Sequence, residues 1–226
     1  MNARVREMIK EALQSDGVQE IFKLSDENET EQDLFDEDYL AKIDKIKLPN
    51  TKIKLLQQLL AKVIGEMKKV NKVKGVNFSK KMQSLVERYN LRDENDVLRS
   101  EVYEEMAEQL TNLIMEVHKE FSAGEALGID FEEKAFYDIL KELCVKYDFN
   151  YPENRLIDLA KAVKNLVEGQ AKFPDWNKRD DIKSALKVGL ILLLDEFGYP
   201  PVERDEVYME IFEQAENFKK NQIVNL

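Results

Sequence analysis

Residues 50–70 read NTKIKLLQQLLAKVIGEMKKV, and their apolar side chains recur in alternating steps of three and four. Because an α-helix turns once every 3.6 residues, this spacing places them on one stripe of a helix. The stripe consists of Ile53, Leu56, Leu60, Val63, Met67 and Val70. Asn50 or Thr51 is expected to cap this helix, with Pro49 just outside its first turn. The stretch therefore predicts a long amphipathic helix packed along one face.

The same spacing recurs along the rest of the chain. It predicts helices over residues 102–121 and 131–147, after Pro152, from about 177 to 197, and over 207–218. No window alternates apolar and polar residues over the length of a strand, so we expect no significant sheet. The predicted fold class is all-α, a multi-helix bundle with an additional short N-terminal helical segment.

The helix expected over residues 177–197 has a distinctive apolar run. Residues 188–194 read VGLILLL, so apolar side chains occur on every side, which predicts burial of most of the helix surface. Gly198-Tyr199-Pro200-Pro201 should end this helix, because glycine adopts the left-handed stop and proline cannot continue a helix. The run is far shorter than the ~20 residues of a membrane span, and no membrane association is expected.

Charge divides the chain into parts. Residues 26–38 contain eight acidic residues and no basic residue, which is typical of a solvated linker. We therefore expect an N-terminal helical segment over residues 1–24, an acidic linker over 25–38 and a C-terminal helical domain over 39–226. The glycine-containing stretch 122–130 leaves open a break between two sub-bundles of that domain.

Composition bounds the class of protein. The chain has 226 residues, of which 43% are hydrophobic and 35% charged, as in ordinary soluble, helix-rich chains. Its single cysteine, Cys144, has no partner for an internal disulfide. This usage favours a reducing compartment, so we expect a cytoplasmic protein.

Basic residues gather in one part of this acidic chain. The formal net charge is -11, yet residues 47–81 carry ten lysines and one acidic residue, Glu66. Three uses remain open for the lysines: a solvated or intramolecular surface, contact with a partner protein, and contact with DNA phosphates. Base readout and single-strand stacking are not indicated, since no arginine lies between Lys47 and Arg88 and Phe78 is the only aromatic residue within 47–81.

Residues suited to catalysis or ligand binding are few. The sequence contains no glycine-rich phosphate-binding loop ending in Lys and Ser or Thr. A calcium-loop spacing within residues 26–37 has Glu31 where the sharp turn needs glycine. The single histidine, His118, has no carboxylate positioned to make it a base. We expect no catalytic, cofactor-binding or metal-binding residue and no enzyme activity in this chain.

Several stretches resemble one family, in the same order along the chain. They are residues 8–22, 50–60 (NTKIKLLQQLL), 68–80 (KKVNKVKGVNFSK), 86–90 (VERYN), 127–140 (LGIDFEEKAFYDIL), 175–179 (DWNKR), 193–194 (LL), 198–201 (GYPP) and 210–216 (EIFEQAE). On these residues the chain resembles the C-terminal helical region of the restriction (motor) subunit of type I restriction-modification enzymes.

This resemblance implies a function. The full-length family subunit is an ATP-dependent type I site-specific deoxyribonuclease, with a nuclease domain and a two-lobed translocase, and its C-terminal region docks onto the modification and specificity subunits. The chain is then expected to be a non-catalytic assembly domain for DNA restriction, with residues 1–24 following the motor domain. ATP and Mg would belong to the parent subunit alone. The alternative is a DNA-contacting helical module that guides duplex DNA during translocation through the lysine-rich segment.

Exposed basic and aromatic positions are the expected contact residues. An exposed tryptophan near a helix start suits an interface, although it also suits a packing anchor. The modification and specificity subunits are the expected partners, with DNA reached through the parent complex and no membrane. The candidate contacts are Lys68, Lys69, Lys72, Lys74, Lys80, Lys81, Trp176, Lys178 and Arg179.

Overall fold

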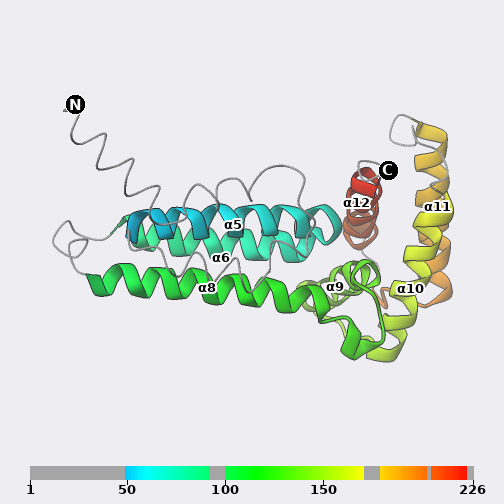
Figure 1. The fold of residues 1–226 in the computed structure, drawn as a ribbon. Helices are drawn as coiled ribbons and strands as arrows, with labels where there is room; N and C mark the ends of the chain where they lie inside the picture. The colour runs from blue at the N-terminus through cyan, green and yellow to red at the C-terminus, as the bar shows by residue number, and fades with distance from the viewer. Residues whose placement is uncertain (1–48, 92–99, 171–178, 203–204, 223–226) are drawn as a thin grey trace. The chain divides into compact units, whose positions relative to one another are not determined.

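The computed structural model describes residues 49–91, 100–170, 179–202 and 205–222. The predicted N-terminal segment (1–24) and acidic linker (25–38) lie outside these residues. The described chain forms seven α-helices and one 3-10 turn, without a strand (Figure 1). The all-α prediction is confirmed. None of the described helices combines the length and apolarity that crossing a membrane requires.

Each helix predicted after residue 50 has a counterpart in the structure. The elements are α5 (Pro49–Val70), α6 (Lys72–Asn90), α8 (Ser100–Ser122), η1 (Glu125–Leu127), α9 (Phe131–Lys146), α10 (Glu153–Gln170), α11 (Asp180–Glu196) and α12 (Asp205–Gln222). Pro49 is itself the first residue of α5, so the expected cap at Asn50 or Thr51 is wrong. Proline suits the first helical position, because the N–H it lacks would have no helical partner there.

The chain divides into two compact units. The first comprises Met1–Glu66 and Ser79–His118, and the second comprises Met67–Phe78 and Lys119–Leu226. Helices α5, α6 and α8 therefore each contain residues of both units. The break expected near 122–130 stays a prediction.

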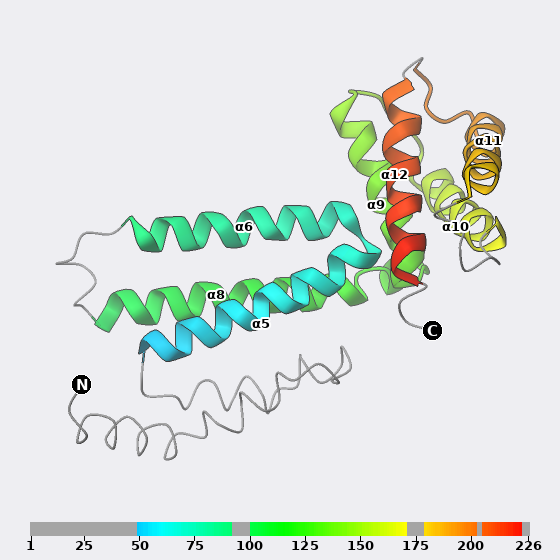
Figure 2. The same cartoon turned by 90° about the horizontal axis from the view of Figure 1, so that it is seen from above.

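In the first unit, α6 and α8 run antiparallel (Figure 2). The stripe predicted for α5 is buried from Ile53 to Met67, and Leu110, Leu113 and Val117 of α8 are buried as well. Leu55, Leu59 and Ile64 are each only 4% exposed, so the prediction that α5 packs along one face is too narrow. Apolar residues at adjacent positions give this helix two neighbouring apolar stripes.

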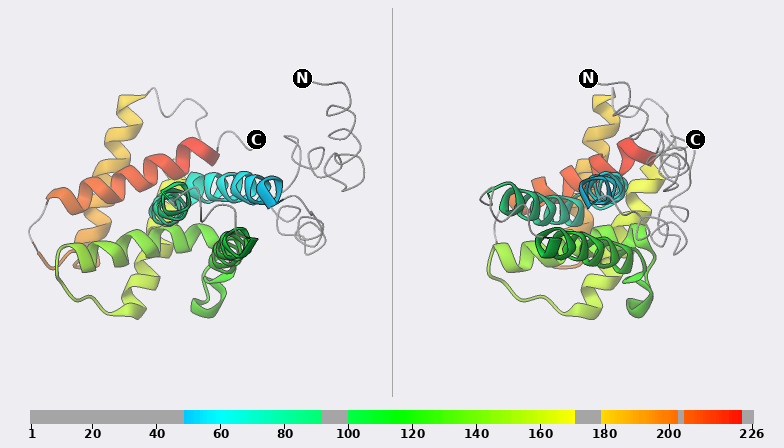
Figure 3. Two further views of the ribbon diagram at one scale, coloured as in Figure 1. Left: turned by 90° about the vertical axis from the view of Figure 1, so that its left-hand side faces the viewer. Right: turned by 60° about the vertical axis from the view of Figure 1, so that its left-hand side comes forward.

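In the second unit, α9 packs against α10 and α12, and α10 also packs against α11 (Figure 3). Tyr199 is 1% exposed, and its hydroxyl donates a 2.7 Å hydrogen bond to the Leu140 carbonyl oxygen. The predicted stripe of α12 is buried completely or almost so. Its residues are Val207, Ile211, Ala215 and Phe218.

Helix α11 is less buried than its sequence predicted. Its apolar run turns only one side toward the core, and Val188, Ile191 and Leu192 are 56%, 41% and 64% exposed. The prediction of burial over most of the helix surface is wrong, because α11 lies at the edge of the second unit, where α10 and α12 pack against one face (Figure 2).

Candidate functional site

The six candidate lysines of the lysine-rich segment (residues 47–81) fall into two groups along the chain. Lys68, Lys69, Lys72 and Lys74 lie in residues 67–78 of the second unit, which we call the α5–α6 elbow. Lys80 and Lys81 lie in the part of α6 that belongs to the first unit. Trp176 and Lys178 lie outside the described residues. Arg179 precedes α11, and its Nη2 lies 2.6 Å from Asp181 Oδ2.

Asn71 forms the break between α5 and α6. Its side-chain Oδ1 accepts a 3.1 Å hydrogen bond from the Lys74 backbone N–H, as a helix cap does. Its Nδ2 donates to Asp138 Oδ2 at 2.7 Å, and the residue is fully buried. The Asn71 side chain therefore caps the start of α6 and joins the elbow to α9 by a hydrogen bond.

Amide side chains of α12 satisfy the backbone of the elbow. Gln214 donates from Nε2 to the Val70 carbonyl oxygen (2.7 Å) and accepts at Oε1 from the Lys72 N–H (3.1 Å). Asn217 donates to the carbonyl oxygens of the two lysines before Val70 at 3.0 and 2.9 Å, and Asn221 donates to the second of them at 3.2 Å. The last carbonyls of a helix have no partner inside it, so these contacts stabilise the end of α5.

A buried ion cluster lies beside Asn71. Lys134 and Asp138 of α9 are 5% and 7% exposed, and the Lys134 Nζ lies 2.8 Å from Asp138 Oδ2. The Lys134 ammonium also contacts Glu120, whose Oε1 lies 3.1 Å from Lys74 Nζ. Burial by itself would lower the pKa of Lys134, but Asp138 and Glu120 outweigh burial and raise this pKa. Lys134 thus remains charged inside the second unit.

Gly75 lies where α6 meets the end of α5. A Cβ atom on Gly75 would lie 2.6 Å from the Lys68 Cα. This separation is far below a normal contact between carbon atoms. Only glycine therefore fits the elbow without a backbone shift.

Two of the elbow lysines form ion pairs within the chain. Lys72 Nζ lies 2.9 Å from Glu213 Oε2, and Lys74 belongs to the ion cluster. Of the three uses left open by the sequence, the contacts of these two lysines fit an intramolecular one. Lys68 has an exposed side chain.

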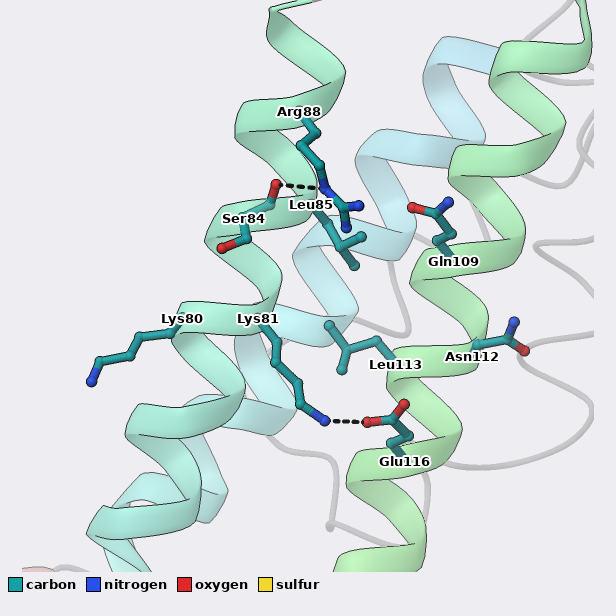
Figure 4. A pocket seen from close by; sticks show the side chains of 9 residues that line it. All are labelled: Lys80, Lys81, Ser84, Leu85, Arg88, Gln109, Asn112, Leu113 and Glu116. Carbon is teal, nitrogen blue, oxygen red and sulfur yellow. Dashed lines mark hydrogen bonds and ion pairs between the residues drawn. The ribbon is translucent and has the colours of Figure 1, made fainter. Parts of the chain in front are cut away.

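The second group lies at a groove between α6 and α8 in the first unit, with a cavity volume of ≈ 550 Å³ (Figure 4). We call it the α6/α8 groove. It is lined by Lys80, Lys81, Ser84, Leu85 and Arg88 of α6 and by Gln109, Asn112, Leu113 and Glu116 of α8.

The α6/α8 groove has polar ends and an apolar centre. At one end Lys81 Nζ lies 2.6 Å from Glu116 Oε2. Leu85 and Leu113 approach each other in the centre, and at the other end Arg88 points across the groove (Figure 4). Lys80 extends away from α8. Among the described residues, no carboxylate pairs with Lys80 or Arg88.

The described contacts at the elbow and the groove are hydrogen bonds and ion pairs that join helices. Within the described ranges, no group of three or more His, Cys, Asp and Glu residues could hold a metal ion. Burial raises the pKa of the Cys144 thiol, which keeps it protonated near neutral pH. The expected lack of a metal or cofactor in this chain stays a prediction.

Sequence reasoning missed the residues that organise the elbow. Asn71, Asp138 and Gln214 were not singled out, although Asn71 interrupts an otherwise helical pattern with a residue that favours caps. Arg88 was noted only as the first arginine after the lysine run. Its place beside the lysines at one groove depends on how α6 meets α8.

Comparisons with known proteins identify the family. Residues 1–221 match the family model described as "Type I restriction enzyme HindI endonuclease subunit-like, C-terminal". The chain belongs to this family. The resemblance noted in the sequence is thereby confirmed.

Two curated relatives are endonuclease subunits of type I restriction enzymes. The MjaIXP endonuclease subunit of Methanocaldococcus jannaschii is 24% identical over 220 residues, which is 94% of this chain and 20% of the relative. The HindI endonuclease subunit of Haemophilus influenzae is 20% identical over 219 residues, which is 96% of this chain and 20% of the relative. The chain thus spans about a fifth of the length of these relatives. No solved structure gives a significant match.

Proposed function

We propose that this chain is a non-catalytic, cytoplasmic assembly domain that docks the ATP-dependent translocase and endonuclease of a type I restriction enzyme onto its modification–specificity methyltransferase. The family match over residues 1–221 carries the proposal. The relatives are named as subunits, which supports an assembly of several chains. ATP and Mg would act in the rest of the parent subunit.

The described helices suit such a role. A docking domain needs a scaffold that keeps its shape and surfaces left open for a partner. At the elbow, amide side chains and a buried ion cluster hold the backbone, which supports a stable scaffold. The α6/α8 groove and the exposed side of α11 remain open among the described residues.

The alternative, a DNA-contacting module, has less support from the lysines. Three of the proposed phosphate contacts already pair with carboxylates of the same chain: Lys72, Lys74 and Lys81. A lysine in an ion pair must give up that partner before it neutralises a phosphate. The pairing therefore favours the assembly role.

The test is a binding measurement with the purified chain at low and high salt. One sample would contain the modification–specificity complex of the same restriction system, and the other would contain duplex DNA. We expect salt-tolerant binding to the protein complex and little binding to DNA. Steeply salt-dependent binding to DNA alone would contradict the assembly role, because affinity based on phosphate contacts falls strongly with salt.

A further inference from the structure

The two walls of the α6/α8 groove repeat the same helical spacing. On α6 the wall residues Lys81, Ser84, Leu85 and Arg88 follow the pattern i, i+3, i+4 and i+7. On α8 the residues Gln109, Asn112, Leu113 and Glu116 follow it too. Each wall therefore extends over two helical turns, about 10 Å. A furrow between two helices with this spacing is the shape that a third helix fills.

The chemistry of the groove limits what can fill it. Leu85 and Leu113 supply an apolar centre (Figure 4). The Lys81–Glu116 ion pair closes one end without net charge. Arg88 at the other end and Lys80 at the rim add positive charge that no described carboxylate neutralises. A complementary surface would carry apolar side chains with a carboxylate at one end.

We propose that the α6/α8 groove is a docking site for an acidic, amphipathic helix of the modification–specificity complex. The inference rests on the proposed function and names the surface that carries it. Apolar residues of the partner helix cover the part of Leu85 that remains exposed beside the buried Leu113. A partner carboxylate accepts hydrogen bonds from Arg88, since a guanidinium matches a carboxylate with two parallel donors.

A protein helix suits this groove better than DNA does. Phosphate binding gains nothing from the apolar centre, and Lys81 is already paired with Glu116. A helix uses both features, because it covers the partly exposed Leu85 and places one charge beside Arg88. The chain's own acidic stretch, residues 26–38, has suitable charge as well, so the test must separate it from a partner.

The experiment compares charge reversal inside and outside the groove. Arg88→Glu would be measured beside the unchanged chain for affinity to the modification–specificity complex and to duplex DNA. Lys54→Glu is the matched control, since Lys54 is exposed on α5 and does not line the groove. Leu85→Asn tests the apolar centre. Circular dichroism and the unfolding midpoint establish that each variant is folded; Arg88 is exposed, so Arg88→Glu should fold.

We expect Arg88→Glu to weaken binding to the protein complex about tenfold or more, as for an arginine that pairs with a partner carboxylate in an interface, and Lys54→Glu to leave this affinity unchanged. Equal affinity of Arg88→Glu and the unchanged chain would overturn the groove site but not the assembly role. Tighter binding by Arg88→Glu would overturn the proposal that a partner helix fills the groove. It would favour residues 26–38 as the occupant, because the substitution would then release the chain's own acidic stretch. Loss of DNA binding alone would overturn the proposal in favour of nucleic acid. If the unchanged chain does not bind the complex, both proposals fail.

Discussion

The two halves of helix α6 have similar lysine content and different surroundings. In Lys72–Phe78, Lys72 and Lys74 pair with Glu213 and Glu120, and the adjoining backbone is held by α12. In Ser79–Asn90, Lys81 pairs with Glu116 at the groove, and no described carboxylate pairs with Arg88. A run of basic residues in a sequence is therefore not one functional surface.

Burial explains part of the difference between the halves, although the Lys72–Glu213 pair is itself exposed. A charged or polar group taken out of water must regain its lost interactions from the protein, so the buried Asn71, Lys134 and Asp138 have matched partners. The groove is open to water, which already solvates its cations. Substitutions in the elbow should thus affect folding, and substitutions in the groove should affect binding.

The largest expected effect comes from Asp138→Ala. It removes the partner of both Lys134 and Asn71, leaving a buried ammonium without its main carboxylate. We expect the free energy of unfolding to fall by about 3–5 kcal/mol, as measured by denaturant titration. Glu116→Ala is the control in the groove, where the half-exposed pair with Lys81 should contribute at most about 1 kcal/mol. Equal losses in the two variants would contradict the comparison.

A pair of glycine substitutions should give effects of opposite sign. Gly75→Ala places a Cβ 2.6 Å from the Lys68 backbone, so we expect destabilisation by about 1–3 kcal/mol. Gly65→Ala, inside α5, meets nothing within 4 Å and should stabilise the chain by up to about 1 kcal/mol through helix propensity. Thermal unfolding of both variants measures the difference. Stabilisation by Gly75→Ala would mean that the two helices separate easily at the elbow.

Acid should weaken the buried ion cluster through Glu120. Burial alone would raise the pKa of Glu120, but Lys134 and Lys74 outweigh burial and lower it below its ordinary value of 4.5. The stabilisation is then fully present above the unfolded pKa and is lost as pH falls through the lowered folded pKa. Unfolding measured from neutral pH to pH ~3 should show a steeper acid loss for the unchanged chain than for Glu120→Gln. Parallel curves would exclude this contribution.

The smallest expected effect on stability comes from Arg88→Ala in the groove. Arg88 is exposed, and its described contact is a 3.3 Å hydrogen bond from Nε to the Ser84 carbonyl oxygen. We expect the free energy of unfolding to change by no more than about 0.5 kcal/mol, measured beside Asp138→Ala. A loss similar to that of Asp138→Ala would place Arg88 in the scaffold rather than on a binding surface.

Local patterns predicted the described α-helices except α6 (Lys72–Asn90), for which no helical spacing was noted. The α12 stripe is buried throughout and the α5 stripe from Ile53 to Met67, as the spacing of their apolar residues indicated. Gly198 adopts a φ of 63°, as expected of the glycine that ends a helix before Pro200. These features depend on neighbouring residues in the chain, so they can be read without knowing the tertiary contacts.

Long-range features were predicted poorly. The exposure of Val188 and Leu192 depends on which helices pack against α11, and the apolar run by itself contains no such information. The roles of Asn71 and Gln214 depend on contacts across 67 and 144 residues of sequence, which helical periodicity does not report. The groove likewise needs both α6 and α8.

The sequence by itself determined the all-α class, the approximate extent of the helices other than α6, and the family. Helical spacing and family sequence motifs can be read from residues that lie close together in the chain. Only the tertiary structure decided that Lys74 forms an ion pair with Glu120 at the elbow, whereas no described carboxylate pairs with Arg88 at the groove. The physical reason is that the environment of a charge depends on the residues that folding brings beside it. Glu120 is 46 positions from Lys74 along the chain, yet their side chains meet in the folded protein.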